Sequence, residues 1–231
     1  MSFAVVCVSL IVKAVSNPGP PVANGPRHSR PSTASPCYHR SVPAPEPMRM
    51  SYADYLAAEE ASETKHEFLR GQVYAMAGGT PEHAGLAGAV IAELSAALRG
   101  RPCRVFSADL RVRIEATDLS TYPDVTVICE TLERSELDAN AATNPTVIVE
   151  VLSDSTEAYD RGEKFAHYRR LPSLREYVLV SQREPRIESY FKNAAGVWVL
   201  SEAGAGETLA LASLDGVSLA TDLVYRDPLS S

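Results

Sequence analysis

Two acidic residues, Asp124 and Glu150, each lie at an end of an apolar, strand-like run. Asp124 lies near the start of the run 122–129, and Glu150 lies near the end of the run 145–152. If the two strands pair antiparallel, the start of one meets the end of the other, and the polar connection between them is long enough for that return. The two carboxylates would then lie side by side in an apolar setting, which is costly unless a cation joins them.

Magnesium suits such a pair, because it binds one or two carboxylates and keeps several waters, which leaves room for a phosphate oxygen. A bound metal can also activate water for hydrolysis. We therefore predict that Asp124 and Glu150 are metal ligands and catalytic residues. The alternative is that Asp124 caps a turn after Pro123 and that Glu150 pairs with Arg111 or Arg113.

Other site signatures are missing from the sequence. It contains no phosphate-binding loop of the G-x-x-x-x-G-K type, no G-x-S-x-G and no H-E-x-x-H. Nucleotide hydrolysis by a phosphate-binding loop and serine-esterase chemistry are therefore poorly supported.

The elements that must position the acidic pair begin at Ser51, which suits the N-cap of a short helix over 52–60. Residues 66–69 and 72–76 flank Arg70-Gly71 and predict a hairpin whose glycine takes a positive φ. Thr80 and Pro81 then predict the N-cap and first residue of the longest helix, which should continue to Leu98 and stop at Gly100.

Runs rich in β-branched residues predict the central strands over 104–114, 122–129 and 145–152. A helical pattern over 156–170 and an apolar strand over 176–181 follow, and this order predicts a right-handed parallel crossover. Further short strands are expected over 187–191, 197–200 and 208–211. The predicted class is α/β, with a central mixed sheet flanked by helices and extra C-terminal strands.

Residues 1–49 differ from the rest of the chain. An apolar stretch from Phe3 to Val15 is followed by Pro, Ser, Asn and Arg with no helical or strand period. We expect this extension to be disordered, or not translated if Met48 or Met50 is the start, and the domain to span 50–228. The apolar stretch is too short to cross a bilayer and lacks the basic region that precedes a secretory signal, so we expect a cytoplasmic protein with no membrane segment.

The charge of the chain is acidic, at −7 overall. The extension contributes +4, so the remainder carries −11 once that +4 is taken from −7; the charged residues of the extension are Lys13, Arg27, Arg30, Arg40, Glu46 and Arg49. A protein that relies mainly on nonspecific phosphate contacts is normally basic. Any role in nucleic-acid binding therefore needs local positive charge.

The four cysteines, Cys7, Cys37, Cys103 and Cys129, are widely spaced and form no C-x-x-C pair. We interpret them as thiols of a reducing compartment, and not as a disulfide or zinc framework.

Four motifs, taken in order, resemble the Uma-two type of restriction endonuclease in the PD-(D/E)XK nuclease superfamily. The resemblance covers most of 51–226 and rests on His66–Val73, Tyr122–Val125, Val149–Thr156 and Lys164–Tyr168, with Tyr177 beyond. It implies a restriction-endonuclease-like fold, a divalent metal such as Mg²⁺, for which Mn²⁺ can substitute, and hydrolysis of DNA. It also implies that Asp124 and Glu150 bind the metal.

The resemblance further assigns Glu67 as an upstream acidic residue that helps to hold the metal or orient its waters. The alternative is a solvated carboxylate at a strand edge. The superfamily's lysine, expected two residues after the glutamate, is replaced here by Leu152. Lys164 on the following helix is the predicted substitute, and it would orient water or stabilise transition-state charge. The alternative is a surface lysine paired with Asp160 four residues earlier.

Four further residues are candidates for substrate contact. Tyr168 could hold Lys164 or touch phosphate, although core packing would also explain it. His83, in the first turn of the long helix, could donate to a phosphate. Arg111 and Arg113 alternate along a predicted strand and could meet a nucleic-acid backbone, or could pair with Glu115 or Asp118.

The sequence thus favours a Mg²⁺-dependent endonuclease that acts on DNA, and a homodimer would suit double-strand cleavage because one metal site cuts one strand. A catalytically silent module that binds nucleic acid or a protein partner is the main alternative. A phosphodiesterase for small nucleotides is a third, and a short closed pocket would favour it.

Overall fold

The computed structural model describes residues 49–76 and 78–227. The prediction made for 1–49 lies outside the described residues, except for Arg49, and the domain boundary at residue 50 stays a prediction. The described chain begins with α1 (Tyr52–Glu60), whose N-cap Ser51 accepts a hydrogen bond from the Asp54 amide at 3.1 Å. The predicted hairpin follows as β1 (His66–Leu69) and β2 (Gln72–Ala75), with Gly71 at φ +86°.

The longest helix, α2 (Pro81–Ala97), begins and ends where the sequence predicts. The Thr80 hydroxyl accepts from the His83 amide at 3.2 Å, which satisfies one of the unpaired amides of the first turn. Its buried face consists of Leu86, Val90 and Leu94. Gly100, at φ +77°, follows the end of the helix.

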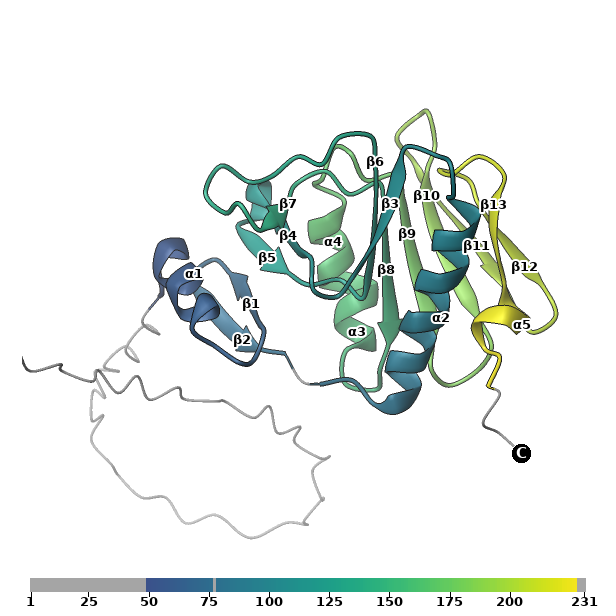
Figure 1. Cartoon of the computed structure of the whole chain (residues 1–231), viewed down its shortest axis with the longest axis horizontal. Coiled ribbons are helices and arrows are strands. Elements are labelled where there is room, and N and C mark those ends of the chain that lie inside the picture. The colour runs from purple at the N-terminus through teal and green to yellow at the C-terminus, as the bar shows by residue number, and fades with distance from the viewer. Residues whose placement is uncertain (1–48, 77, 228–231) are drawn as a thin grey trace, which may run out of the picture. The chain divides into compact units, whose positions relative to one another are not determined.

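A six-stranded mixed sheet forms the centre of the domain, in the order β11-β10-β9-β8-β6-β3 (Figure 1). Strand β8 pairs antiparallel with β6 and parallel with β9, as the sequence predicts. The strands are β3 (Cys103–Ser107), β6 (Val125–Cys129), β8 (Val147–Leu152), β9 (Glu176–Ser181), β10 (Ile187–Lys192) and β11 (Trp198–Ala203).

A second sheet has the order β2-β1-β5-β4-β7. It adds β4 (Arg111–Ile114), β5 (Leu119–Thr121) and β7 (Ala141–Ala142), with a short 3-10 turn over Glu115–Thr117. The prediction of a single strand over 104–114 was wrong. The chain turns after β3, where the Leu110 amide donates to the Ser107 carbonyl, and β4 then joins the other sheet.

The predicted helix over 156–170 contains a π-helical turn. It consists of α3 (Glu157–Tyr159), the π turn η2 (Asp160–Lys164) and α4 (Phe165–Tyr168). Turns of this type are uncommon inside α-helices and often mark functional sites.

Hydrophobic cores lie on both faces of the central sheet. Figure 1 shows α2 on one side and α3 and α4 on the other. The α2 side also contains β12 (Thr208–Leu211), β13 (Val217–Ala220) and α5 (Thr221–Val224), of which β13 and α5 were not predicted. The other core joins α4 to β4 and β5, with Ile148 and Leu152 of β8 between them. Strand β8 is therefore buried on both faces, as its apolar composition indicates.

A disulfide joins Cys103 to Cys129, so the prediction of free thiols at these positions was wrong. The two residues lie directly opposite each other in the β3–β6 pair, with Cα atoms 3.9 Å apart. Because the two cysteines are 26 residues apart, the sequence did not show that they would lie opposite each other. The bond removes the cysteine argument for a reducing compartment, while Cys7 and Cys37 lie outside the described residues.

Within the described ranges, no helix is long and apolar enough to cross a membrane.

Candidate functional site

Asp124 and Glu150 lie next to each other at one end of the central sheet. The antiparallel register pairs Val125 with Val149, which puts Asp124 across from Glu150. The Asp124 amide lies 3.4 Å from Glu150 Oε2, and the Val151 amide donates to Asp124 Oδ2 at 2.7 Å. The backbone of the strand pair therefore fixes both carboxylates, as the predicted strand ends require.

Glu150 is 3% exposed and points to the α4 face of the sheet. Its Oε1 lies 2.9 Å from Lys164 Nζ and accepts a hydrogen bond from the Tyr168 hydroxyl at 2.7 Å. Burial raises the pKa of Glu150 to about 8; the Lys164 ammonium opposes this shift, while Asp124 and Asp160 add to it. The cluster therefore has more carboxylates than cations.

Lys164, the last residue of the π turn, is 6% exposed, so it is not the surface lysine of the alternative interpretation. It does contact Asp160, at 3.3 Å, in addition to Glu150. Burial alone would lower the pKa of Lys164, but the surrounding carboxylates of Glu150, Asp160 and Glu67 outweigh it and raise the pKa. The side chain is therefore a cation at neutral pH.

The π turn fixes the position of Lys164. Asp160 and Lys164 are its two buried residues and both face the sheet. The Tyr177 hydroxyl of β9 donates to the Asp160 carbonyl at 3.0 Å and anchors the turn from below. The turn thus holds the ammonium over the end of β8.

Glu67 of β1 joins the same cluster from the second sheet. It is 8% exposed, so it is not a solvated carboxylate at a strand edge. The Thr121 hydroxyl donates to its Oε2 at 2.8 Å, and the Tyr159 hydroxyl donates to its Oε1. Tyr159 and Thr121 carried no signal in the sequence, where an aromatic residue on a helix and a threonine in a strand suggest only packing.

His83 contacts the acidic pair. Its Nε2 lies 3.2 Å from Asp124 Oδ2, and this hydrogen bond raises the pKa of His83. The first turn of α2 therefore faces the site, although the contact is to a carboxylate. A role in phosphate binding stays a prediction.

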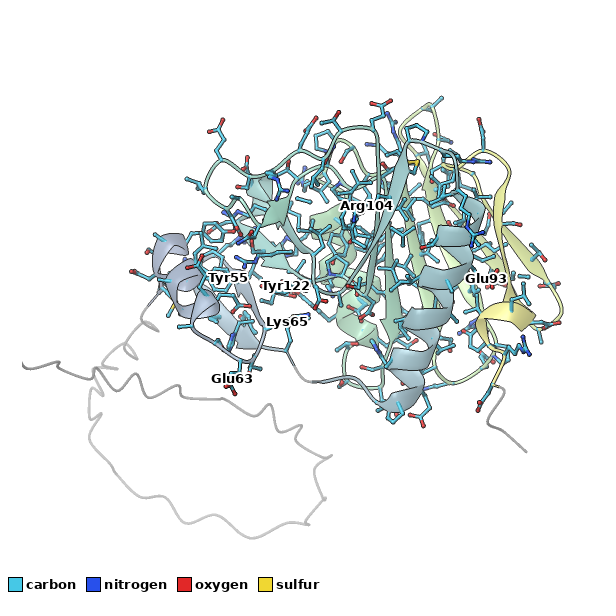
Figure 2. All side chains as sticks on the ribbon, viewed as in Figure 1. Tyr55, Glu63, Lys65, Glu93, Arg104 and Tyr122 are labelled. Atoms are coloured by element: carbon cyan, nitrogen blue, oxygen red, sulfur yellow. A yellow bond between two sulfur atoms is a disulfide. The ribbon has the colours of Figure 1, made fainter. Side chains whose placement is uncertain are left out.

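Arg111 and Arg113 are 7% and 5% exposed and are paired inside the domain, which favours the alternative of pairing, while contact with a nucleic-acid backbone stays a prediction. Arg113 pairs with Asp118 at 2.5 Å, as the alternative proposed, whereas Arg111 pairs with Asp138 at 2.7 Å. Arg111 also lies over the rings of Tyr55 and Tyr122, which Figure 2 labels close together. These arginines stabilise the contact between α1 and the second sheet.

Tyr168 is fully buried, which favours the alternative of core packing, and a contact with phosphate stays a prediction. Its hydroxyl holds Glu150, and burial raises its pKa well above the usual range, so it stays a donor. It therefore orients the glutamate.

No group of three or more His, Cys, Asp or Glu side chains is arranged to hold a metal ion in the described part of the chain. Two adjacent carboxylates nevertheless fit Mg²⁺, which needs only one or two of them and completes its shell with water. Burial is the main cause of the raised pKa of Glu150, and Asp124 and Asp160 add to it, so a further cation beside these carboxylates would favour the ionised form. The donor set therefore fits a hard divalent cation and contains no soft ligand.

The mixed sheet flanked by helices is a restriction-endonuclease-like fold, and the adjacent acids and the buried lysine lie at one end of this sheet. A solved structure from Anabaena variabilis, described as "a putative nuclease belonging to DUF820", has this fold. It superposes with a TM-score of 0.62 at 15% identity, over 78% of this chain and 98% of its own.

Residues 52–222 match the model of the Uma2 family, described as "Putative restriction endonuclease", and the chain therefore belongs to this family. Two relatives come from Synechocystis sp. The uncharacterized protein slr1290 is 40% identical over 186 residues, which cover 80% of this chain and 96% of the relative. The uncharacterized protein sll1609 is 35% identical over 153 residues, which cover 66% and 86%.

Proposed function

We propose that this protein is a divalent-metal-dependent endonuclease that hydrolyses phosphodiester bonds in DNA. One observation carries the proposal: a buried lysine ammonium, on Lys164, lies 2.9 Å from Glu150, whose neighbour across the strand pair is Asp124. Family membership and fold support nuclease chemistry.

Asp124 and Glu150 are the residues that would hold Mg²⁺ or Mn²⁺. Oε1 of Glu150 is shared by Lys164 and Tyr168, whereas Oε2 has only the long contact with the Asp124 amide among the interactions of the described residues. A bound metal would neutralise charge on the phosphate and lower the pKa of a water ligand. His83 and the metal would have to share the Asp124 carboxylate, because His83 Nε2 already contacts its Oδ2.

Lys164 would act as a cation and hydrogen-bond donor, because its raised pKa keeps the ammonium protonated. It would orient the attacking water or stabilise the charge that develops on the phosphate, a role in which preorganised donors are effective. Glu67 would assist from the second sheet. Tyr159 and Tyr168 would act as positioning residues, since they donate to Glu67 and Glu150.

The test is nicking of supercoiled plasmid by the purified protein from Met50 onward, with Mg²⁺ or Mn²⁺. We expect Asp124→Asn and Lys164→Met to abolish nicking, whereas Lys192→Met, on β10, should match the parent. Both site variants keep the size of the original side chain. Absence of cleavage by the parent with both metals, on supercoiled plasmid and on single-stranded DNA, would refute the proposal.

A catalytically silent binding module remains the second candidate, because the cluster is internally paired: Lys164 contacts Glu150, and His83 contacts Asp124. Stable binding of DNA without nicking would favour it. We also propose that a double-strand cut requires a homodimer, since one metal site cuts one strand. Light scattering of the protein with and without DNA would test this.

A further inference from the structure

The edge strand β3 presents Arg104 and Phe106 on the same sheet face as Glu150. Phe106 pairs with Thr126 of β6, and Thr126 pairs with Ile148 of β8. Ile148 precedes Glu150 by two residues, and side chains two apart in a strand share a face. Phe106 therefore belongs to the row of side chains next to the acidic pair.

The spacing between this row and the acidic pair follows from sheet geometry. Two inter-strand steps of roughly 4.8 Å and one two-residue step of roughly 6.8 Å separate Phe106 from Glu150, which gives about 12 Å. A nucleic-acid strand whose phosphate lies at Asp124 and Glu150 could therefore reach Phe106 within a short length.

A hollow of about 360 Å³ opens beside this row. Its volume lies in the range of small-molecule sites. A second hollow, of about 480 Å³, adjoins it and shares Arg104 and Glu130. The first is lined by Arg104, Phe106, Ile128, Glu130, Leu132 and Arg134.

The lining combines the aromatic ring of Phe106, the apolar side chain of Ile128 and the positive charge of arginines. The Arg104 guanidinium lies 5.4 Å from the centre of the Phe106 ring, and Ile128 beneath is 2% exposed. Arg101, Arg104 and Arg134 outnumber the one carboxylate, Glu130, in the two hollows. Figure 2 labels Arg104 beside β3. This is a local positive region on a protein of net charge −7.

An aromatic ring beside arginines is the chemistry that holds a nucleotide, since bases stack on aromatic and guanidinium planes and arginine binds phosphate. A base can stack in such a hollow only when it is unpaired. We propose that this hollow is a subsite for an unpaired nucleotide of the strand cleaved at the acidic pair. The inference rests on the proposed function and narrows the substrate to DNA with a single-stranded segment beside the scissile phosphate.

The experiment measures binding separately from cleavage. Fluorescence anisotropy with the full chain in EDTA compares a short labelled single-stranded oligonucleotide with its blunt duplex. We expect Phe106→Leu, which keeps an apolar side chain but removes the ring, to weaken single-strand binding at least about fivefold, the low end of one stacked base. Arg104→Gln should lower the slope of log affinity against log salt by about 0.7. The matched control is Arg226→Gln, beyond α5 on the other side of the sheet.

The subsite would be overturned if the parent did not bind the single strand, or if it bound single strand and duplex with equal affinity. It would also be overturned if Phe106→Leu and Arg104→Gln both bound the single strand with the affinity of the parent. Because Arg104 is exposed, its variant reports on binding even if Phe106→Leu unfolds. If the parent nicks plasmid and both variants bind the single strand with the affinity of the parent, the subsite is refuted and the proposed nuclease is kept. Binding that depends on Phe106, with no cleavage of plasmid or single-stranded DNA in either metal, keeps the subsite and removes the proposed nuclease.

Discussion

Lys164 Nζ lies 2.9 Å from Glu150 Oε1 and is held there by a helix that crosses the end of the central sheet. Both residues of this contact are buried: Lys164 is 6% exposed and Glu150 is 3% exposed. A buried pair of this type costs desolvation when it forms, so its stabilising contribution is small unless further hydrogen bonds satisfy it. Tyr168 and Asp160 supply those additional contacts.

The first prediction concerns this pair. Lys164→Met should lower the nicking rate at least about 100-fold, the scale of a lost transition-state donor. It should also lower the free energy of unfolding by up to about 3–5 kcal/mol above pH 8, where Glu150 is ionised as well as Asp160, because both carboxylates then lose their buried cation. Adding Glu150→Gln should recover part of the stability but none of the activity. Urea unfolding of both variants measures this, and an unchanged unfolding midpoint in Lys164→Met would contradict it.

The second prediction follows from the pKa of Glu150, which burial raises from 4.5 to about 8. In metal-free protein the folded state retains this proton while the unfolded state loses it above pH 4.5. The stabilisation from Glu150 is therefore complete below pH 4.5 and is lost as pH rises to about 8.

The measurement for the second prediction is urea unfolding between pH 5 and pH 8 in EDTA, for the parent and Glu150→Gln. The parent should lose more stability than the variant over this interval. Lys164 does not alter the expected sign, because its pKa is raised and it stays charged throughout. Parallel curves for the two proteins would show that Glu150 is already ionised at pH 5.

The third prediction is that Mg²⁺ stabilises the folded protein through Asp124 and Glu150. A cation at 100 times its dissociation constant adds about 2.7 kcal/mol to the free energy of unfolding. Scanning calorimetry should show a melting temperature several degrees higher in Mg²⁺ than in EDTA, and the shift should vanish in Asp124→Asn. The exposed control Asp215→Asn should keep the shift, and its loss there too would indicate nonspecific binding.

The fourth prediction concerns the disulfide between Cys103 and Cys129. Replacing both residues with serine should lower the free energy of unfolding by about 3.5 kcal/mol, since the bond closes a loop across 26 residues. Nicking at a temperature where both proteins are folded should not change, because Cys129 lies at the opposite end of β6 from Asp124. Equal stability of the oxidised parent and the double variant would contradict the prediction.

The sequence predicted the position of the acidic pair because antiparallel strands bring opposite ends together. Asp124 and Glu150 could be placed from two apolar runs and the length of their connection. The parallel β8–β9 unit followed in the same way from a strand, helix, strand order. In both cases a short-range pattern determines which ends of the strands meet.

Longer-range features could not be predicted. β-branched residues over 104–114 indicate a strand, but nothing local shows that the chain turns at Ser107 and changes sheets. The partner of Arg111 is Asp138, in a connection with no regular period. Tyr159 reaches Glu67 only because two sheets meet there. Each of these contacts depends on tertiary packing.

The π turn of 160–164 has a consequence for how such sites change during evolution. A π turn contains one more residue per turn than the α-helix around it, and residues in an α-helix advance about 100° each. Deleting one residue, such as the exposed Gly162, would restore regular winding and rotate Lys164 away from Glu150 or Asp160 away from Lys164. A single-codon deletion could therefore silence the site while every proposed catalytic residue remains in the sequence. Active and silent homologues would then differ in helix register, which residue identity alone does not reveal.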